Sequence, residues 1–268
     1  MAQSDSDFVG SIPDTYQRFL EPALFVPYAV DLAARLHGRR VSRVLEIAAG
    51  TGVLTRELRR SLPPEVEIVA TDLNAAMLET AQHVSSLENV RWQVADAAAL
   101  PFEAGTFDVI VCQFGVMFFP DKIHCAREAR RVLQPGGVFA FNLWDTIGKN
   151  PVAHAVVQAG KSFFPTDPPH FYERGPHGYA DAAVVEAHVR EAGFTHVETH
   201  SVDARLQSSS VGDFAHGVCE GSPLRAEIIA RDPSGTAAFR EALARNLARE
   251  FGEGPLDAAM RAHVFLVS

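Results

Sequence analysis

Between Val41 and Trp144, short apolar runs alternate with segments in which apolar residues recur at helical spacing. Apolar strands spaced by helices indicate a parallel sheet that is covered on both faces. We expect strands over about 42–48, 66–71, 90–95, 107–114 and 138–144, and helices over about 53–61, 74–84 and 121–133.

The flanking segments are less regular. Residues 8–37 predict helical segments interrupted by Pro13, Pro22 and Pro27, and their Phe and Leu content suggests a cap laid over another part of the fold. After Trp144 we expect helices over about 151–163 and 181–192, a strand over about 196–206, mostly helical residues 207–258 and a last strand at 260–267. The expected organisation is one domain over 1–268, with a helical cap at 1–40, a cofactor-binding core at 41–145 and substrate-side insertions at 146–180 and 207–258.

The first strand and helix are joined by a stretch of small residues. An apolar run ends at Glu46, and Ala48-Ala49-Gly50-Thr51-Gly52 leads into a helix. Glycines let a backbone approach a ligand closely, and the free N–H groups of the helix then face that ligand. Asp72 ends the second apolar run, where a carboxylate can accept hydrogen bonds from a ribose diol. These features predict a cofactor that carries adenosine.

A nicotinamide fingerprint requires a third glycine, and this chain has Thr55 at that position. The wider set of motifs is more specific: Glu46-x-x-x-Gly50-x-Gly52, Thr71-Asp72-Leu73, Ala95-Asp96-Ala97, Phe107-Asp108-Val109-Ile110 and Leu133-Gln134-Pro135-Gly136-Gly137. In this order and spacing they resemble the class I S-adenosylmethionine (SAM)-dependent methyltransferases, in the small-molecule, ubiquinone-methylase-like branch. Residues 41–145 carry nearly all of the resemblance.

The resemblance implies an α/β fold: a doubly wound, Rossmann-like sheet of seven strands in the order 3-2-1-4-5-7-6, with strand 7 antiparallel and a helical cap. It also implies roles for single residues. Ala48, Ala49 and Gly50 would line the methionine part of SAM, with Gly52 completing the turn and Glu46 supporting it. Asp72 would bind the ribose beside Leu73, and Asp96 and Ala97 would meet the adenine. Gln113 would form the floor next to the sulfonium, and Tyr16 would close over the cofactor.

Each of these residues also has a purely structural explanation. Gly50 and Gly52 could serve only to form the turn, and Asp96 could be an ordinary turn residue. Asp72 could cap the following helix, and Gln113 could be a polar residue at the end of its strand. Met77, at helical spacing from Leu73, is a candidate cofactor contact that fits a core position better. The family usually has glycine where this chain has Ala48, which narrows the space beside the methionine part of the ligand.

Methyl transfer from a sulfonium is an in-line displacement, so it depends on alignment and on exclusion of water, with a base needed only where the nucleophile holds a proton. His154 and Tyr16 are the catalytic candidates, and His170, His177 and Tyr179 are further histidine and tyrosine candidates in or near the 145–180 loop. Trp144 and Asp145 end the fifth strand and could face the substrate. Aromatic residues near this edge suggest an apolar or aromatic acceptor.

The composition narrows the partners. The net charge of −9 argues against nucleic acid, and three cysteines without ligand spacing predict no metal site and fit a reducing cytoplasm. The acidic start does not fit a signal peptide, and no apolar run has the length of a membrane span.

We expect a small-molecule methyltransferase acting on a hydroxyl or a related nucleophile. The alternatives are a non-catalytic SAM-binding protein, a NAD-dependent oxidoreductase and a macromolecule methylase. The oligomeric state stays open.

Overall fold

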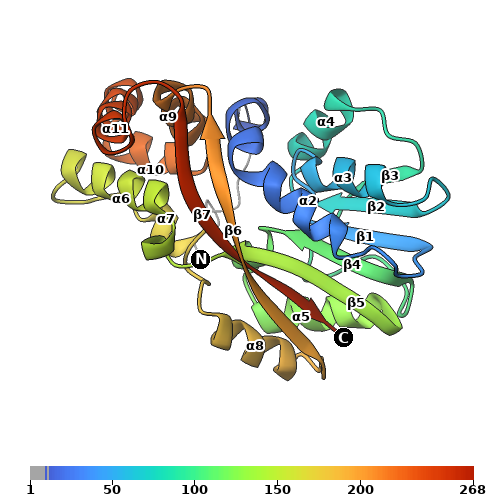
Figure 1. Ribbon diagram of the computed structural model, residues 1–268. Coiled ribbons are helices and arrows are strands. Elements are labelled where there is room, and N and C mark those ends of the chain that lie inside the picture. The colour runs from blue at the N-terminus through green and yellow to red at the C-terminus, as the bar shows by residue number, and fades with distance from the viewer. Residues whose placement is uncertain (1–9, 11) are drawn as a thin grey trace.

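The computed structural model describes Gly10 and residues 12–268. Seven strands form one sheet in the order β3-β2-β1-β4-β5-β7-β6 (Figure 1). The strands are β1 Arg43–Ile47, β2 Glu67–Asp72, β3 Val90–Val94, β4 Phe107–Gln113, β5 Leu133–Trp144, β6 Val197–Ser208 and β7 Leu256–Val267. The first five are parallel, and β7 runs antiparallel to β5 and β6. The fold and the strand order expected from the sequence are confirmed.

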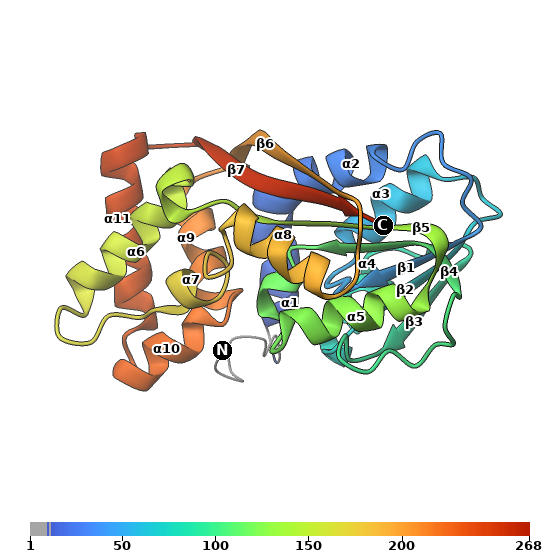
Figure 2. The same cartoon turned by 90° about the horizontal axis from the view of Figure 1, so that it is seen from below.

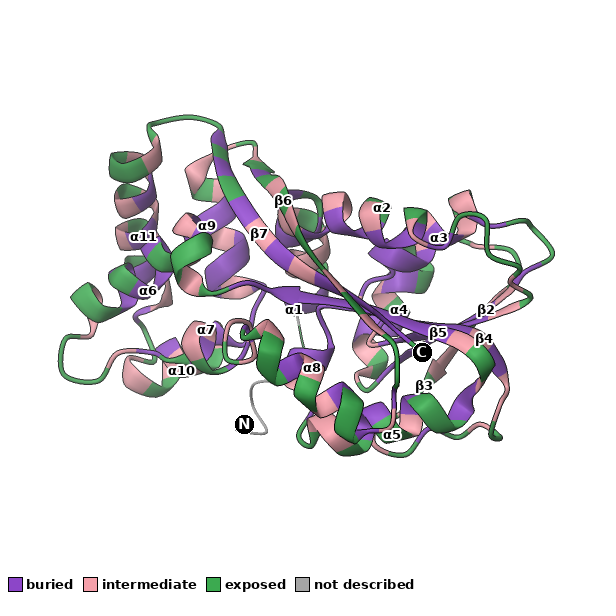
Figure 3. Cartoon of the chain, turned by 60° about the horizontal axis from the view of Figure 1, so that its bottom comes forward, coloured by how far each residue is buried: buried purple, intermediate pink, exposed green. Residues whose placement is uncertain are grey.

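Helices cover both faces of the sheet (Figures 1 and 2). On one side lie α2 Val26–Ala34, α3 Val53–Ser61 and α4 Ala75–Val84, and on the other lie α5 Lys122–Val132 and α8 Ala182–Glu191. Strands β1, β2 and β4 are almost fully buried, which explains why their sequences are apolar on consecutive positions (Figure 3). The strands end at one edge of the sheet, and the functional site lies at that edge.

The N-terminal segment is helical without a break from Ile12 to Ala34. A short helix α1 Ile12–Thr15 continues into the π-helix η2 Tyr16–Phe25 and then into α2. The three prolines do not interrupt it: Pro13 lies at its start, Pro22 lies within the wider turns of η2, and Pro27 lies in the first turn of α2. The part of the expected cap that precedes Gly10, with Phe8, lies outside the described residues.

A second group of helices lies beyond the end of β5 (Figure 1). After the 3₁₀ turn η4 Ile147–Lys149 come α6 Pro151–Phe163 and α7 Phe171–Arg174. Helices α9 Val211–Glu220, α10 Leu224–Arg231 and α11 Thr236–Phe251 connect β6 to β7. Because β6 and β7 pair with each other from Val197↔Val267 to Ser208↔Leu256, they extend past β5 and carry these helices with them. One further 3₁₀ turn, η3 Val116–Phe118, follows β4.

Candidate active site

A cavity of about 510 Å³ lies at the carboxyl ends of β1, β2, β4 and β5. One part of its wall comes from the turns that follow β1, β2 and β3. The opposite part comes from η2, from the segments that follow β4 and β5, and from α9 and the β6–β7 pair. The volume is in the range of pockets that enclose a whole small molecule.

Nine of the residues predicted to bind the cofactor line this cavity. They are Tyr16, Ala48, Gly50, Asp72, Leu73, Met77, Asp96, Ala97 and Gln113. Glu46, Ala49 and Gly52, which were predicted from the same motif, are not among the lining residues. The motif therefore brings most of its members to one place, and the other three lie behind them.

The turn after β1 has left-handed backbone at Ala48, Gly50 and Gly52, with φ of 56°, 56° and 82°. Ala49 packs beside Ala70 and Leu78 and is not among the residues that line the cavity, so the cavity lining does not support its predicted place beside the methionine part of SAM. Gly52 is the N-cap of α3, and a Cβ there would lie 2.9 Å from the Trp92 ring. The second glycine thus allows close packing of the turn on β3, which is a structural role.

Asp72 connects two turns of the site. One carboxylate oxygen accepts a hydrogen bond from Gly50 N at 2.9 Å, and the other accepts one from Asn74 N at 2.8 Å. Burial raises the pKa of Asp72, and these N–H bonds oppose that shift. Each carboxylate oxygen has two lone pairs, so acceptor capacity remains toward the cavity. Asp72 is therefore both the anchor of the glycine turn and a lining residue.

Glu46 lies behind the turn and is 1% exposed. Its carboxylate accepts a hydrogen bond from Thr55 Oγ1 at 2.6 Å, which ties the end of β1 to the first turn of α3. Burial raises the pKa of Glu46 to about 8, against the opposing effects of Thr55 and Arg56. Its position fits the predicted support of the turn, and a direct contact with a ligand in the cavity is not available to it.

Replacement of Glu46 by Gln should make the stability less dependent on pH. Because the pKa of Glu46 rises from 4.5 to about 8 on folding, the folded state holds a proton that the unfolded state releases between these values. The free energy of unfolding of the wild type therefore falls as the pH rises through this window. We expect E46Q to be more stable by about 2 kcal/mol at pH 8.5, with a smaller difference at pH 5.

Urea unfolding at both pH values measures this difference, with E88Q at an exposed position as the control. Equal pH dependence in E46Q and wild type would contradict it.

The turns after β2 and β3 form an open end of the cavity. Leu73 is 56% exposed there, an unusual place for a large apolar side chain, whereas Met77 is buried. Asp96 is exposed, and one of its oxygens accepts a hydrogen bond from Ala98 N at 2.8 Å. The arrangement offers an apolar surface at Leu73 and Ala97 next to a carboxylate, which suits a planar heterocycle with an amino group.

The floor of the cavity is at the end of β4. Gln113 Nε2 donates a hydrogen bond to Phe25 O at 3.2 Å, while its buried Oε1 has no partner among the described residues. The next residue, Phe114, has a φ of 50°, and its ring stacks on that of Trp144 with the ring centres 4.1 Å apart. A buried carbonyl oxygen without a donor is costly, so this position suits a ligand that supplies positive charge or an N–H group.

The Ala48 side chain is accommodated by a glycine on the facing segment. A Cβ at Gly115 would lie 2.5 Å from Ala48 Cβ and 2.6 Å from Cys112 Sγ. We therefore expect G115A to lower the free energy of unfolding by about 1–3 kcal/mol through overpacking, and an added Ala48→Gly change to recover part of that loss. Chemical denaturation measures it, with G148A as the control because a Cβ there meets nothing within 4 Å. An effect of G115A no larger than that of G148A would contradict the prediction.

The N-terminal segment is joined to the glycine turn by a buried ionic contact. Glu21, which is 5% exposed, accepts a hydrogen bond from Thr51 Oγ1 at 2.6 Å and pairs with Arg56 of α3. Arg56 in turn donates to Thr51 O at 2.8 Å. In the same π-helix, Tyr16 stacks on Phe25 at 5.2 Å, and burial together with Glu21 and Asp72 raises its phenol pKa well above the usual value. The segment is thereby fixed over the cavity with Tyr16 in the wall.

The two predicted catalytic residues are placed differently. Tyr16 lines the cavity, but its high pKa keeps it protonated and unsuited to act as a base. His154 is exposed, and its Nε2 lies 3.2 Å from Gln158 on the outer face of α6, so it is not in the site. The histidine that lines the cavity is His177, in the loop after α7. His170 is exposed and paired with Glu173.

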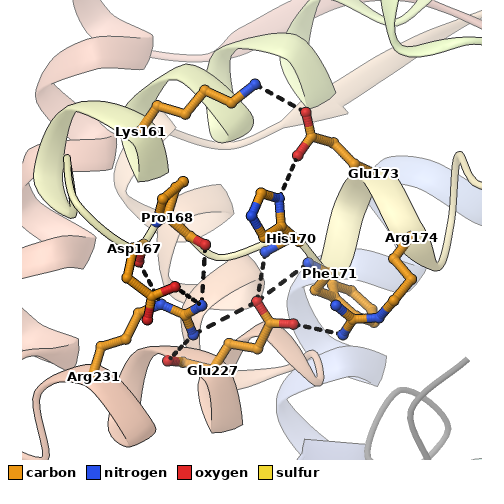
Figure 4. Close-up of polar contacts among 9 residues, drawn as sticks. All are labelled: Lys161, Asp167, Pro168, His170, Phe171, Glu173, Arg174, Glu227 and Arg231. Carbon is orange, nitrogen blue, oxygen red and sulfur yellow. Dashed lines mark hydrogen bonds and ion pairs between the residues drawn. The ribbon is translucent and has the colours of Figure 1, made fainter.

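Residues 167–174, which precede His177 in the chain, are held by a polar network (Figure 4). Glu227 of α10 accepts hydrogen bonds from the backbone N–H groups of His170 and Phe171 at 2.7 and 3.3 Å, and from Arg174 at 2.6 Å. Arg231, one turn later, donates to Asp167 O at 2.6 Å. Lys161 of α6 and His170 both contact Glu173. Helices α6 and α10 thus fix the segment that presents Phe171, Tyr172 and His177 to the cavity.

Several lining residues carry no sequence signal for a site. Leu20 and Leu24 of η2, Phe214 of α9, Leu206 of β6 and Met260 of β7 form the far wall. They are apolar residues at helical or alternating spacing, so in the sequence they look the same as core residues. Asn74 also lines the cavity, and its position directly after the Asp72-Leu73 pair was a signal that could have identified it.

Comparison with known proteins defines the family of the central part. The methyltransferase domain family matches residues 44–137, which contain the glycine turn, Asp72, Asp96 and Gln113. Residues 44–137 of the chain carry a methyltransferase domain. The family recognised from the sequence is confirmed, and with it S-adenosylmethionine as the expected cofactor.

Curated relatives match the chain over a limited length. A ubiquinone/menaquinone biosynthesis C-methyltransferase (UbiE) of Idiomarina loihiensis is 44% identical over 103 residues, which is 37% of this chain and 41% of the relative. A demethylmenaquinone methyltransferase of Staphylococcus aureus is 36% identical over 101 residues, 37% of this chain and 42% of the relative. The chain thus spans about two fifths of the length of these methyltransferase relatives.

Solved structures share the fold over most of the chain. The YcgJ protein of Bacillus subtilis aligns with a TM-score of 0.59 and 19% identity, covering 90% of this chain and 97% of its own. The [4+2]-cyclase SpnF aligns with a TM-score of 0.58 and 17% identity, covering 91% and 81%. At these identities the likeness describes the fold alone, and a cyclase among the neighbours illustrates that this methyltransferase fold does not fix the reaction. Within the described residues no helix is long and apolar enough to cross a membrane.

Proposed function

We propose that this protein transfers the methyl group of SAM to an uncharged apolar or aromatic small molecule that carries a hydroxyl group. The observation that carries the proposal is the continuity of the cavity. The same space that is lined by Asp72, Gly50 and Gln113 extends past Trp144 to Phe171 and Tyr172. A methyl donor and an acceptor can therefore meet inside one water-poor enclosure.

The lining supports SAM at the end near β1 and β2. Asp72 would bind the ribose hydroxyls with its remaining lone pairs, and Leu73 and Ala97 would sandwich the adenine with Asp96 near its amino group. Ala48 and Gly50 would face the methionine part. The unpartnered Gln113 Oε1 fits a positively charged ligand, since it places a partial negative charge at the floor.

The remaining wall suggests the class of acceptor. The described lining contains no Lys, Arg or Glu, and its carboxylates, Asp72 and Asp96, both lie at the proposed donor end. An anionic or cationic acceptor would be desolvated there without a countercharge, which is costly. A neutral ring system meets no such penalty. Quinols, the substrates suggested by the names of the UbiE-type relatives, are one member of this class.

Bound SAM supplies an electrophilic methyl group on a positive sulfur. The protein contributes alignment and dryness: η2 closes one side, and the loop fixed by Glu227 closes another. Two reactants that are held in line react as if one were present at an effective concentration of about 10⁵ M or more. Asp72 and Gln113 would fix the donor, and the aromatic wall would fix the acceptor ring.

Two measurements test the proposal. Isothermal titration of the full chain with SAM and with S-adenosylhomocysteine should show binding of both, and absence of binding would reject it. Labelled methyl transfer is then measured on a panel of hydroquinones, phenols, carboxylates and amines. Transfer to phenols or hydroquinones supports the proposal, and transfer confined to amines contradicts the acceptor class. Tight cofactor binding without transfer to any member favours a SAM-binding protein without catalysis.

A further inference from the structure

His177 lies in the acceptor half of the cavity wall. It follows α7, and its backbone N–H donates to Tyr172 O at 3.0 Å, which closes the loop. The centre of the imidazole ring lies 6.4 Å from the centre of the Tyr172 ring and 6.2 Å from that of Trp144. Trp144 stacks on Phe114, the residue after Gln113, so His177 is linked through two rings to the floor of the proposed donor site.

The tautomer of His177 is set by the backbone. Nδ1 lies 2.8 Å from Asp145 O, and a carbonyl oxygen only accepts hydrogen bonds, so Nδ1 carries the proton. The same carbonyl accepts a hydrogen bond from Asn150 Nδ2 at 3.1 Å, which keeps it in place. Nε2 is left as the ring nitrogen with a lone pair, and none of the described residues donates to it. His177 thus places a fixed, unprotonated acceptor in the cavity wall, where the described lining of this side contains no carboxylate, lysine, arginine or further histidine.

The surroundings keep the imidazole neutral. Burial lowers the pKa of His177 to about 4, and the carbonyl and carboxylate of Asp145 act in the opposite direction. The Asp145 carboxylate is itself engaged by Thr146 N at 2.6 Å and by His263 Nε2 of β7 at 3.4 Å. The remaining titratable group packed on the ring is Tyr172, whose buried phenol has a raised pKa and stays protonated. At neutral pH the group that faces the acceptor is therefore a free base.

We propose that His177 Nε2 is the catalytic base that removes the proton from the acceptor hydroxyl during methyl transfer. This inference rests on the proposed function. The O–H bond breaks with its proton moving to Nε2, the oxygen or a conjugated ring carbon attacks the methyl carbon, and the C–S bond breaks with its electron pair going to sulfur. The products are the methylated acceptor, S-adenosylhomocysteine and an imidazolium that returns its proton to solvent. After attack by carbon, that carbon loses its proton to solvent and the oxygen takes one up, which restores the aromatic ring and its hydroxyl group.

The oxyanion that develops beside Nε2 favours the imidazolium. An adjacent negative charge raises the pKa of a histidine, so a ring that is neutral in the empty cavity becomes a better base as the acceptor ionises. The other described cavity groups do not offer this chemistry, because the phenols of Tyr16 and Tyr172 stay protonated and the two carboxylates, Asp72 and Asp96, are at the proposed donor end.

Three variants test the role. H177Q keeps a hydrogen-bond acceptor but cannot take a full proton, H177F removes both functions, and H154Q at the exposed face of α6 is the matched control. With a phenol or hydroquinone that the wild type methylates, we expect kcat to fall by about 100-fold or more in H177Q and H177F. KM should change little in H177Q, and H154Q should behave as wild type. Unchanged kcat in H177Q would overturn the proposal.

A spectroscopic readout separates this inference from the proposed function. In the full chain with ¹⁵N-labelled histidine and bound S-adenosylhomocysteine, His177 should be neutral with its proton on Nδ1 from pH 6 to 8. Addition of phenol as the probe, which stays protonated in this range, should shift the Nε2 resonance of His177 toward a hydrogen-bonded state, while the histidine signals of H177Q should not respond. A proton on Nε2, or no response to the phenol, would overturn the inference even where the cofactor binds. Failure of S-adenosylhomocysteine to bind the wild type would instead reject the proposed function.

Discussion

Replacement of Asp72 by Ala should weaken the binding of S-adenosylhomocysteine by about 1–3 kcal/mol, the cost of leaving buried polar groups without partners. The change removes the acceptor for Gly50 N and Asn74 N as well as the proposed ribose contact. The glycine turn would then lose its anchor at the point where the ligand approaches the backbone. Isothermal titration of the folded variant measures the loss.

The chain offers a matched control for this experiment. One oxygen of Asp108 accepts hydrogen bonds from Ser42 N and Arg43 N at 2.7 and 2.8 Å, at the opposite edge of the sheet. D108A therefore removes a carboxylate that has the same kind of backbone partners but no place in the cavity. We expect it to lower stability while leaving cofactor affinity unchanged. Equal affinity in D72A and D108A would remove Asp72 from the binding site.

Replacement of Glu21 by Ala should lower the free energy of unfolding by about 3 kcal/mol, because it leaves the partly buried Arg56 without its carboxylate. It also removes the acceptor of Thr51 Oγ1 and so separates η2 from the glycine turn. We expect cofactor affinity to fall together with stability. Urea unfolding and isothermal titration on the same variant measure the two effects.

An exposed ion pair supplies the comparison for Glu21. Arg205 Nε of β6 lies 2.6 Å from Asp257 Oδ1 of β7, and the side chains of Asp257 and Arg205 are 50% and 59% exposed. Such pairs contribute under about 1 kcal/mol, so D257A should change little. A loss of stability in E21A no greater than in D257A would show that the contact between the cap and the turn is not stabilising.

The central sheet could be predicted from the sequence because its strands are short apolar runs bounded by turns. The helices expected at 53–61 and 151–163 have those limits in the structure. The limits of long strands were harder to predict. The pairing of β5 with β4 becomes regular at Val138, where the strand was expected to begin. The assigned strand starts earlier because Leu133 pairs with Phe107, but a register shift separates this pair from the rest, and Gly136 between them has a φ of 79°. Strands β6 and β7 extend beyond the predicted limits because they stabilise each other, which a local pattern does not reveal.

The sequence predicted most of the cavity wall that lies at the ends of β1, β2 and β3, the proposed donor half, but not the opposite wall, the proposed acceptor half. The donor residues lie within a few positions of the strand ends, so their spacing carries the geometry. The acceptor wall depends on segments that are distant in the chain, such as Leu24, Phe214 and Met260. His154 lies outside the cavity because Val152, Ala155 and Val156 form the buried face of α6. That helical spacing was visible in the sequence.

The pairing of Ser208 with Leu256 at the far end of the β6–β7 hairpin has a practical meaning. Residues 209–255 leave and rejoin the sheet at one point and bring Phe214 to the cavity, whereas Asp72 ends a strand of the sheet itself. Because Glu227 of the same stretch also holds residues 170–174, a graft of this stretch from another protein has to keep that contact if it is to alter the proposed acceptor wall alone.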